Sequence, residues 1–76
     1  MGQDKVIIEL AKDEALVLFE FLANRHNRND LHFDDQAEQR VLWNIEGALE
    51  KSLAEPFRSD YLEILTAARN NVRDKE

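Results

Sequence analysis

Histidine and carboxylate side chains gather in one stretch of this sequence, and they are the residue types best suited to chemistry. The stretch spans residues 26–38 and contains His26, Asp30, His32, Asp34, Asp35 and Glu38. Imidazole and carboxylate groups together can hold Zn²⁺ or another divalent metal ion. Their spacing matches no known ligand motif, and the last three acids lie where a helix is expected to begin. We therefore expect no metal site and no cofactor.

Side chains able to act as a catalytic nucleophile are few. The chain has no cysteine, and its only serines and threonine are Ser52, Ser59 and Thr66. None of them has a histidine and an aspartate at a recognisable spacing, and Ser59 lies where a helix cap is expected. A Gly-rich phosphate loop is missing too, since the only glycines are Gly2 and Gly47. We predict that the protein is not an enzyme.

Length and charge narrow the classes of partner. A chain of 76 residues supports a single domain, residues 1–76, and its net charge is −6. A nucleic-acid-binding protein normally presents a basic surface, because neutralising phosphates supplies most of its non-specific affinity. A helix-turn-helix is disfavoured as well, because Asp60 and Glu63 would stand at the start of its recognition helix. We expect no nucleic-acid partner.

The sequence gives no sign of secretion or membrane insertion. Its first residues lack the basic start and long apolar run of a signal peptide. No apolar stretch approaches the roughly 20 residues that cross a bilayer. The lack of cysteine is compatible with a reducing compartment. We expect a cytoplasmic protein without a membrane partner.

The element that stands out ahead of the helices is an extended segment at the front of the chain. Its sequence is Lys5-Val6-Ile7-Ile8-Glu9-Leu10, with three consecutive β-branched residues, which predicts a strand over residues 5–10. A lone strand leaves backbone N–H and C=O groups unpaired, so it needs a partner in this chain or in another. The only internal candidate is a very short second strand over residues 31–33.

Helical periodicity accounts for most of the remaining chain. A first helix over residues 13–28 is apolar on most sides, which is typical of a central helix. A second runs over residues 35–53 with Asp34 as N-cap, and a third runs to residue 72 with Ser59 as N-cap. The predicted fold class is α+β, in the order β-α-β-α-α and mainly helical.

Trp43 is hard to place in a plain core, because it projects about 80° outside the apolar arc of the second helix. One explanation is that the Pro56-Phe57 connection or the start of the third helix folds back over the indole. The other is that the ring belongs to a contact surface, where tryptophan is enriched. Gly47, one turn later, would allow a partner's backbone to approach.

Three stretches of the sequence, with their spacing, are distinctive. They are DEALVLFEFL over residues 13–22, QAEQRVLW over residues 36–43 and LAEPF over residues 53–57. Together they resemble a family of small uncharacterised bacterial proteins of unknown function. The resemblance implies a cytoplasmic bacterial protein, and it brings no activity, ligand or catalytic residue. Members of that family favour a hydroxyl residue before the acidic pair of the first helix, where this chain has Ala11 and Lys12.

These observations favour a protein whose role is association with another chain. The first hypothesis is a non-catalytic protein-protein association module, a homodimer joined by strand edges and an apolar stripe on the first helix. The expected interface residues are Val6, Ile7, Ile8, Val17, Phe21 and Trp43. The alternative is an acidic inhibitor of the antitoxin or immunity class that binds a basic partner protein, which the net charge permits.

Overall fold

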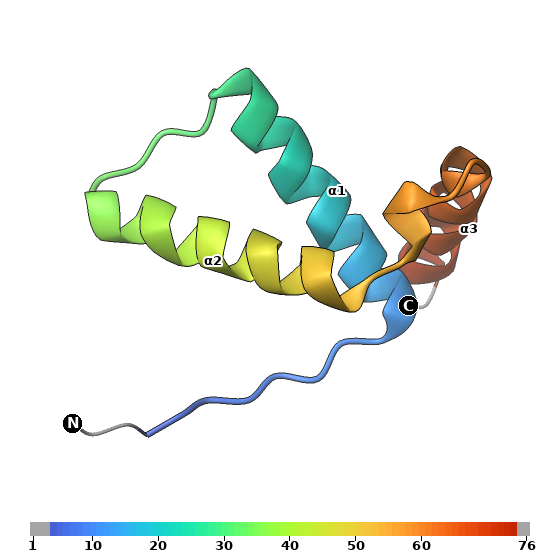
Figure 1. Ribbon diagram of the computed structural model, residues 1–76, viewed down its shortest axis with the longest axis horizontal. Coiled ribbons are helices and arrows are strands. Elements are labelled where there is room, and N and C mark those ends of the chain that lie inside the picture. The colour runs from blue at the N-terminus through green and yellow to red at the C-terminus, as the bar shows by residue number, and fades with distance from the viewer. Residues whose placement is uncertain (1–3, 75–76) are drawn as a thin grey trace.

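The fold is built on three α-helices, seen in a computed structural model that describes residues 4–74. In chain order they are α1 (Lys12–Arg28), α2 (Gln36–Ser52) and α3 (Tyr61–Arg73), and a short 3₁₀ helix, η1 (Glu55–Phe57), lies between α2 and α3. Helix α1 lies in the middle and packs against α2 on one side and α3 on the other (Figure 1). No strand forms anywhere within residues 4–74. The fold is therefore helical, and the prediction of an α+β fold is wrong.

The strand expected over residues 5–10 is an extended segment without a partner strand, which we call the arm. It leaves the start of α1 and runs back beside α2 (Figure 1). Within the described chain, its backbone makes no hydrogen bond. Residues 31–33 lie in the α1–α2 connection, and α2 separates them from the arm in Figure 1. β-Branched residues favour an extended backbone, but a strand also requires a neighbour, and the folded monomer places none there.

Both ends of helix α1 are capped by hydrogen bonds from a backbone N–H group of the cap residue. Its N-cap is Ala11, which has no side-chain acceptor, but the Ala11 N–H donates to Glu14 Oε1 at 2.9 Å, which is half of a capping box. At the other end Asn29 adopts a left-handed conformation with φ 55°, and its N–H donates to the Arg25 carbonyl at 2.8 Å. Asparagine tolerates this conformation at little cost, so the helix stops cleanly there.

The hydrophobic core lies mainly between α1 and α3. Leu16, Leu22 and Leu65 are each only 1% exposed. The full set of buried apolar residues is Ala15, Leu16, Phe19, Leu22, Leu53, Leu65 and Ala68. Helix α2 contributes none of them, and only Leu53, directly after its end, is buried. Since each buried leucine stabilises the fold by about 1.5–3 kcal/mol, this small core carries much of the stability.

The two later helices begin at different residues from those predicted. Helix α2 takes Asp35 rather than Asp34 as N-cap, and the Asp35 carboxylate accepts from the Ala37 N–H at 2.7 Å. Helix α3 begins at Tyr61 after Asp60, so the prediction that Ser59 caps it is wrong. The Asp60 carboxylate makes no cap hydrogen bond either. It is held instead by two hydrogen bonds from the Arg58 guanidinium, at 3.0 and 3.1 Å.

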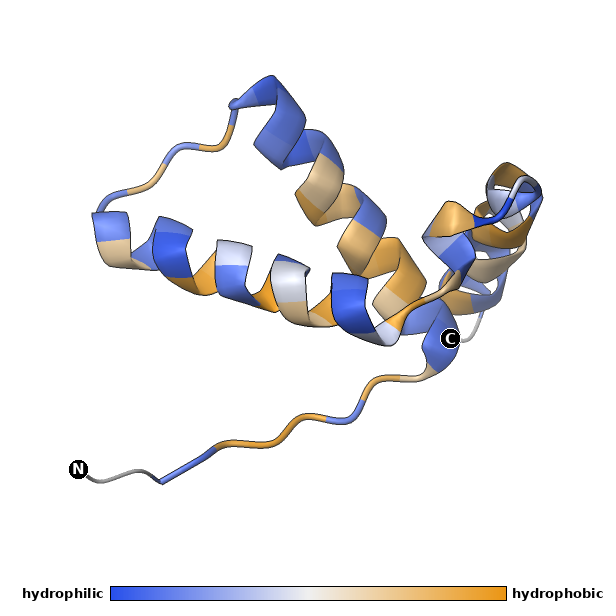
Figure 2. Ribbon diagram, in the orientation of Figure 1, coloured by the Kyte–Doolittle hydropathy of each residue, from blue (hydrophilic) through white to orange (hydrophobic). Residues whose placement is uncertain are grey.

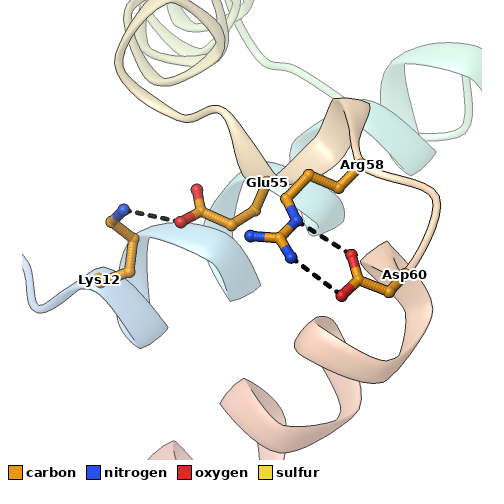
Figure 3. A network of polar contacts seen from close by, with 4 residues as sticks. All are labelled: Lys12, Glu55, Arg58 and Asp60. Atoms are coloured by element: carbon orange, nitrogen blue, oxygen red, sulfur yellow. Dashed lines mark hydrogen bonds and ion pairs between the residues drawn. The ribbon is translucent and has the colours of Figure 1, made fainter.

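Polar contacts around η1 fix the place where the arm leaves the helices (Figure 3). Lys12, the first residue of α1, donates from Nζ to Glu55 Oε2 at 2.9 Å. This hydrogen bond lowers the pKa of Glu55 below its usual value. It joins the start of α1 to the connection between α2 and α3, so the root of the arm is tied to the helical body.

Candidate functional site

The arm exposes the largest group of apolar side chains next to one another in the sequence. Val6, Ile7 and Ile8 are 89%, 84% and 76% exposed, respectively. Figure 2 shows this hydrophobic stretch running clear of the helices. Side chains of this size are usually buried, and a contiguous exposed group of them marks an interaction surface.

A groove runs between the arm and the helices. Every second arm residue, Val6, Ile8 and Leu10, lines it, whereas Ile7 does not. This alternation is what an extended backbone produces, since successive side chains point to opposite faces. The opposite wall comes from α1 and α2, and the hollow measures about 470 Å³; the helix residues lining it are Leu18, Ile45, Ala48, Leu49 and Ser52. The arm therefore presents one face to its own helices and the other face to solvent.

A second apolar hollow lies where α1 connects to α2. It measures about 590 Å³ and is lined by Leu31, His32, Phe33, Ala37, Glu38, Val41 and Leu42. Val41 is 54% exposed at its edge. The backbone of residues 31–33 also makes no hydrogen bond within the described chain, but the large apolar side chains that line this hollow are less exposed than Val6, Ile7 and Ile8. The arm and its groove are the stronger candidate.

Trp43, in the middle of α2, packs against the C-terminal end of α1. Its ring stacks on His26 of α1, with centroids 4.3 Å apart and planes at 13°, and Phe33 meets it edge-on at 6.0 Å. His26 Nδ1 also lies 3.0 Å from Glu46 Oε1 on α2. The aromatic rings seen against the indole thus come from α1 and the connection after it, rather than from Pro56 and Phe57. Trp43 is half-buried within its own chain.

The histidines and acids of residues 26–38 do not converge on one point. Within the described residues, no three histidine, aspartate or glutamate side chains are placed to hold a metal ion. Asp30 accepts from the Arg25 guanidinium at 2.9 Å, and Asp35 caps α2. His32 Nε2 and Asp34 Oδ1 are 4.0 Å apart, with both side chains at least 90% exposed. Most of these groups therefore have separate structural partners.

The predicted stripe of Val17 and Phe21 is divided by the fold. Val17 is half-buried and packs against the core. Phe21 is 45% exposed, but the Arg25 guanidinium lies over its ring, 5.2 Å from the centroid. Of the predicted interface residues, Val6, Ile7 and Ile8 are the most exposed, each by at least 76%.

Among the residues that the structure describes, Tyr61 of α3 is the titratable side chain with a large pKa shift. Its hydroxyl donates to Glu20 Oε1 at 2.9 Å. Burial, with this hydrogen bond and the glutamate charge, raises the pKa of Tyr61 well above its usual value. A tyrosine whose neutral form is favoured in this way stays protonated at neutral pH and ties α3 to α1 through this hydrogen bond.

The helix wall of the groove was not predicted from the sequence. Leu18 and Ile45 lie on helices that the periodicity predicts, but Ile45 is 38% exposed. No local signal in the sequence distinguishes a partly exposed Ile45 from a buried one, because its exposure depends on where α1 and the arm lie after folding.

Comparison with known proteins does not add a function. The chain matches no protein-family model, no curated protein and no solved structure. Within the described part of the chain, none of the helices combines the length and the apolar character required to cross a lipid bilayer.

Proposed function

We propose that this protein is a non-catalytic association module that forms a homodimer through the arm and the groove beside it. The observation that carries the proposal is the arm itself. Three consecutive β-branched side chains are at least 76% exposed, on a backbone without hydrogen bonds to the rest of the described chain. Burial of each such side chain is worth about 1.5–3 kcal/mol, so covering the arm is strongly favoured.

A second copy of the chain is the partner that best meets these requirements. An unpaired extended segment can recruit another strand, because a neighbouring extended backbone offers N–H and C=O groups at the matching spacing. Each copy presents the same segment, and two-fold symmetric contacts between identical surfaces are the commonest kind in soluble oligomers. The exposed edge of Ile45 adds apolar surface beside the arm.

The proposal assigns no catalytic role to the hydroxyl side chains. Ser52 donates to the Ala48 carbonyl at 3.0 Å and Thr66 donates to the Leu62 carbonyl at 2.8 Å, so both are engaged with their own helices. We place the module in the cytoplasm, because a chain without cysteine has no need of an oxidising compartment.

The test is the molar mass of arm variants in solution. Ile7→Lys and Ile8→Lys place a charge where an apolar contact is proposed, so both should reduce the dimer to monomer over a range of concentrations. Leu62→Lys is the matched control, since Leu62 is 74% exposed on α3, away from the arm. It should leave the dimer unchanged. Loss of the dimer in Leu62→Lys alone would overturn the assignment of the interface to the arm.

A monomeric wild-type protein would reject the homodimer. The surface of Val6, Ile7 and Ile8 would then have to be covered by a different chain. The acidic inhibitor of a basic protein would become the hypothesis to pursue, and its check is whether a basic protein encoded nearby is neutralised by this one.

A further inference from the structure

Around Ile7, the arm has an apolar residue on each side and then a charged residue on each side. Ile7 is flanked by Val6 and Ile8, and these are flanked by Lys5 and Glu9, which carry opposite charges. When two such arms lie antiparallel about a two-fold axis through Ile7, each residue faces the one equally far on the other side of the centre. Lys5 of each copy then lies opposite Glu9 of the other, and Val6 lies opposite Ile8.

We infer that the dimer is joined by a two-stranded antiparallel ribbon in this register. The inference rests on the proposed function and specifies its partner geometry. Opposite charges directly across a strand pair stabilise it, and like charges destabilise it. The symmetric register provides two Lys5–Glu9 pairs at once, one at each end of the apolar centre.

Other registers lose these pairs or create repulsion. Moving the two-fold axis by one residue to Val6 sets Lys5 against Ile7 and Asp4 against Ile8. Moving it to Ile8 sets Glu9 against Ile7 and Lys5 against Ala11. Parallel pairing in register sets Lys5 against Lys5 and Glu9 against Glu9. The charges of the arm therefore select one antiparallel arrangement.

The groove supplies the second requirement of the ribbon. A two-stranded ribbon by itself is marginally stable in water, so it needs an apolar surface to cover one face. Directly opposite residues of an antiparallel pair point to the same side. In the symmetric register, Val6 and Ile8 of both arms share one face, which is the face that lies over Ile45 and Leu49. Ile7 of each copy lies on the opposite face, at the two-fold axis.

Disulfide cross-linking tests the register directly, because the natural chain has no cysteine. Ile7→Cys places two thiols opposite each other, with Cα atoms about 4.5–5.5 Å apart, within the range that a disulfide spans. The double variant Val6→Cys/Ile8→Cys places thiols at the neighbouring opposed pairs. Facing pairs alternate along an antiparallel ribbon between hydrogen-bonded and non-hydrogen-bonded, and the Cα atoms are closer in the non-hydrogen-bonded kind. Either the Ile7–Ile7 pair or the two Val6–Ile8 pairs therefore have this closer spacing. Both variants should form a covalent dimer under mild oxidation.

The single variants Val6→Cys and Ile8→Cys are the matched controls. Identical residues there are offset by about 7 Å along the strands, so their Cα atoms lie beyond the reach of a disulfide. Efficient cross-linking of either control would overturn the register. The same holds if the variants still dimerise but neither Ile7→Cys nor Val6→Cys/Ile8→Cys forms a covalent dimer. In both cases the homodimer itself still stands. A monomeric wild-type protein overturns the homodimer itself.

Charge reversal provides an independent readout. Lys5→Glu or Glu9→Lys alone should raise the dimer dissociation constant about ten-fold, because two attractive pairs become repulsive. The double variant Lys5→Glu/Glu9→Lys restores both pairs with exchanged signs and should recover the wild-type constant. If the double variant lost as much dimer affinity as the two single variants together, that result would contradict the pairing of Lys5 with Glu9.

Discussion

Helix α1 is covered differently on its two sides. On one side α3 buries Leu65 and Ala68, and Tyr61 reaches across to Glu20. On the other side α2 buries none of its residues, Ile45 is 38% exposed, and the arm beyond it exposes most of its apolar surface. The α3 side buries two of its apolar residues in the core and leaves Leu62 exposed, whereas the α2 side buries none and has the apolar arm beside it. This difference indicates which side folds the monomer and which side is available to a second chain.

The largest expected effect lies on the α3 side. Leu16→Ala should lower the free energy of unfolding by about 2–5 kcal/mol, because it leaves a cavity at a residue that is 1% exposed. Ile7→Ala is the comparison and should change the stability of the monomer by less than about 0.5 kcal/mol. Urea unfolding at low protein concentration measures both. Equal losses at the two positions would mean that the arm belongs to the monomer's fold.

An intermediate effect is expected where α2 meets the end of α1. His26→Ala removes the ring stacked on Trp43 and the contact with Glu46, so it should cost about 1–2 kcal/mol. His32→Ala is the control, since the His32 side chain is 93% exposed. The chain has a single tryptophan, so indole fluorescence reports this contact directly. An emission spectrum that is unchanged in His26→Ala would contradict the stacking.

A smaller effect is expected at the hydrogen bond between α3 and α1. Tyr61→Phe should cost about 0.5–1.5 kcal/mol at neutral pH. Because the folded-state pKa of Tyr61 is raised, its contribution is fully present below the unfolded pKa of about 10 and is lost as the pH rises above it. Wild-type stability should therefore fall in that range, and that of Tyr61→Phe should fall less. Tyr61 is the only tyrosine, so tyrosinate absorbance follows it directly; ionisation at the ordinary pKa would contradict its burial.

The smallest effect concerns Gly47 on α2. A Cβ at this position would meet nothing within 4 Å, so Gly47→Ala should raise the stability by up to about 1 kcal/mol. The arm model predicts that it leaves the dimer unchanged. A weaker dimer with a more stable monomer would show that a partner's backbone approaches α2 at this glycine, and would move the interface beyond the arm.

The helices of this fold could be predicted because their signals are local. The apolar periodicity of α1 predicts its central position, and the acids and glutamine after residue 33 predict the start of α2 to within one residue. Helix α3 starts one residue later than predicted, because its first backbone hydrogen bonds run from the Glu63 and Ile64 N–H groups to the Asp60 carbonyl.

The strands could not be predicted from local signals, because a strand is defined by its neighbour. Val6, Ile7 and Ile8 favour an extended backbone, and the arm is extended (Figure 1). Whether an extended segment becomes a strand depends on where the rest of the chain goes, and here α2 separates it from residues 31–33. The position of Trp43 depended in the same way on a distant residue, His26, whose ring it meets only after α1 and α2 pack.

The most direct test of the account is the molar mass of the wild-type protein in solution, measured by light scattering after size-exclusion chromatography over a wide concentration range. The account predicts a dimer, with twice the 8.9 kDa mass of the chain, that dissociates to monomer only on dilution. A mass of one chain at every concentration would contradict it, because the apolar arm would then have to be covered by a different partner.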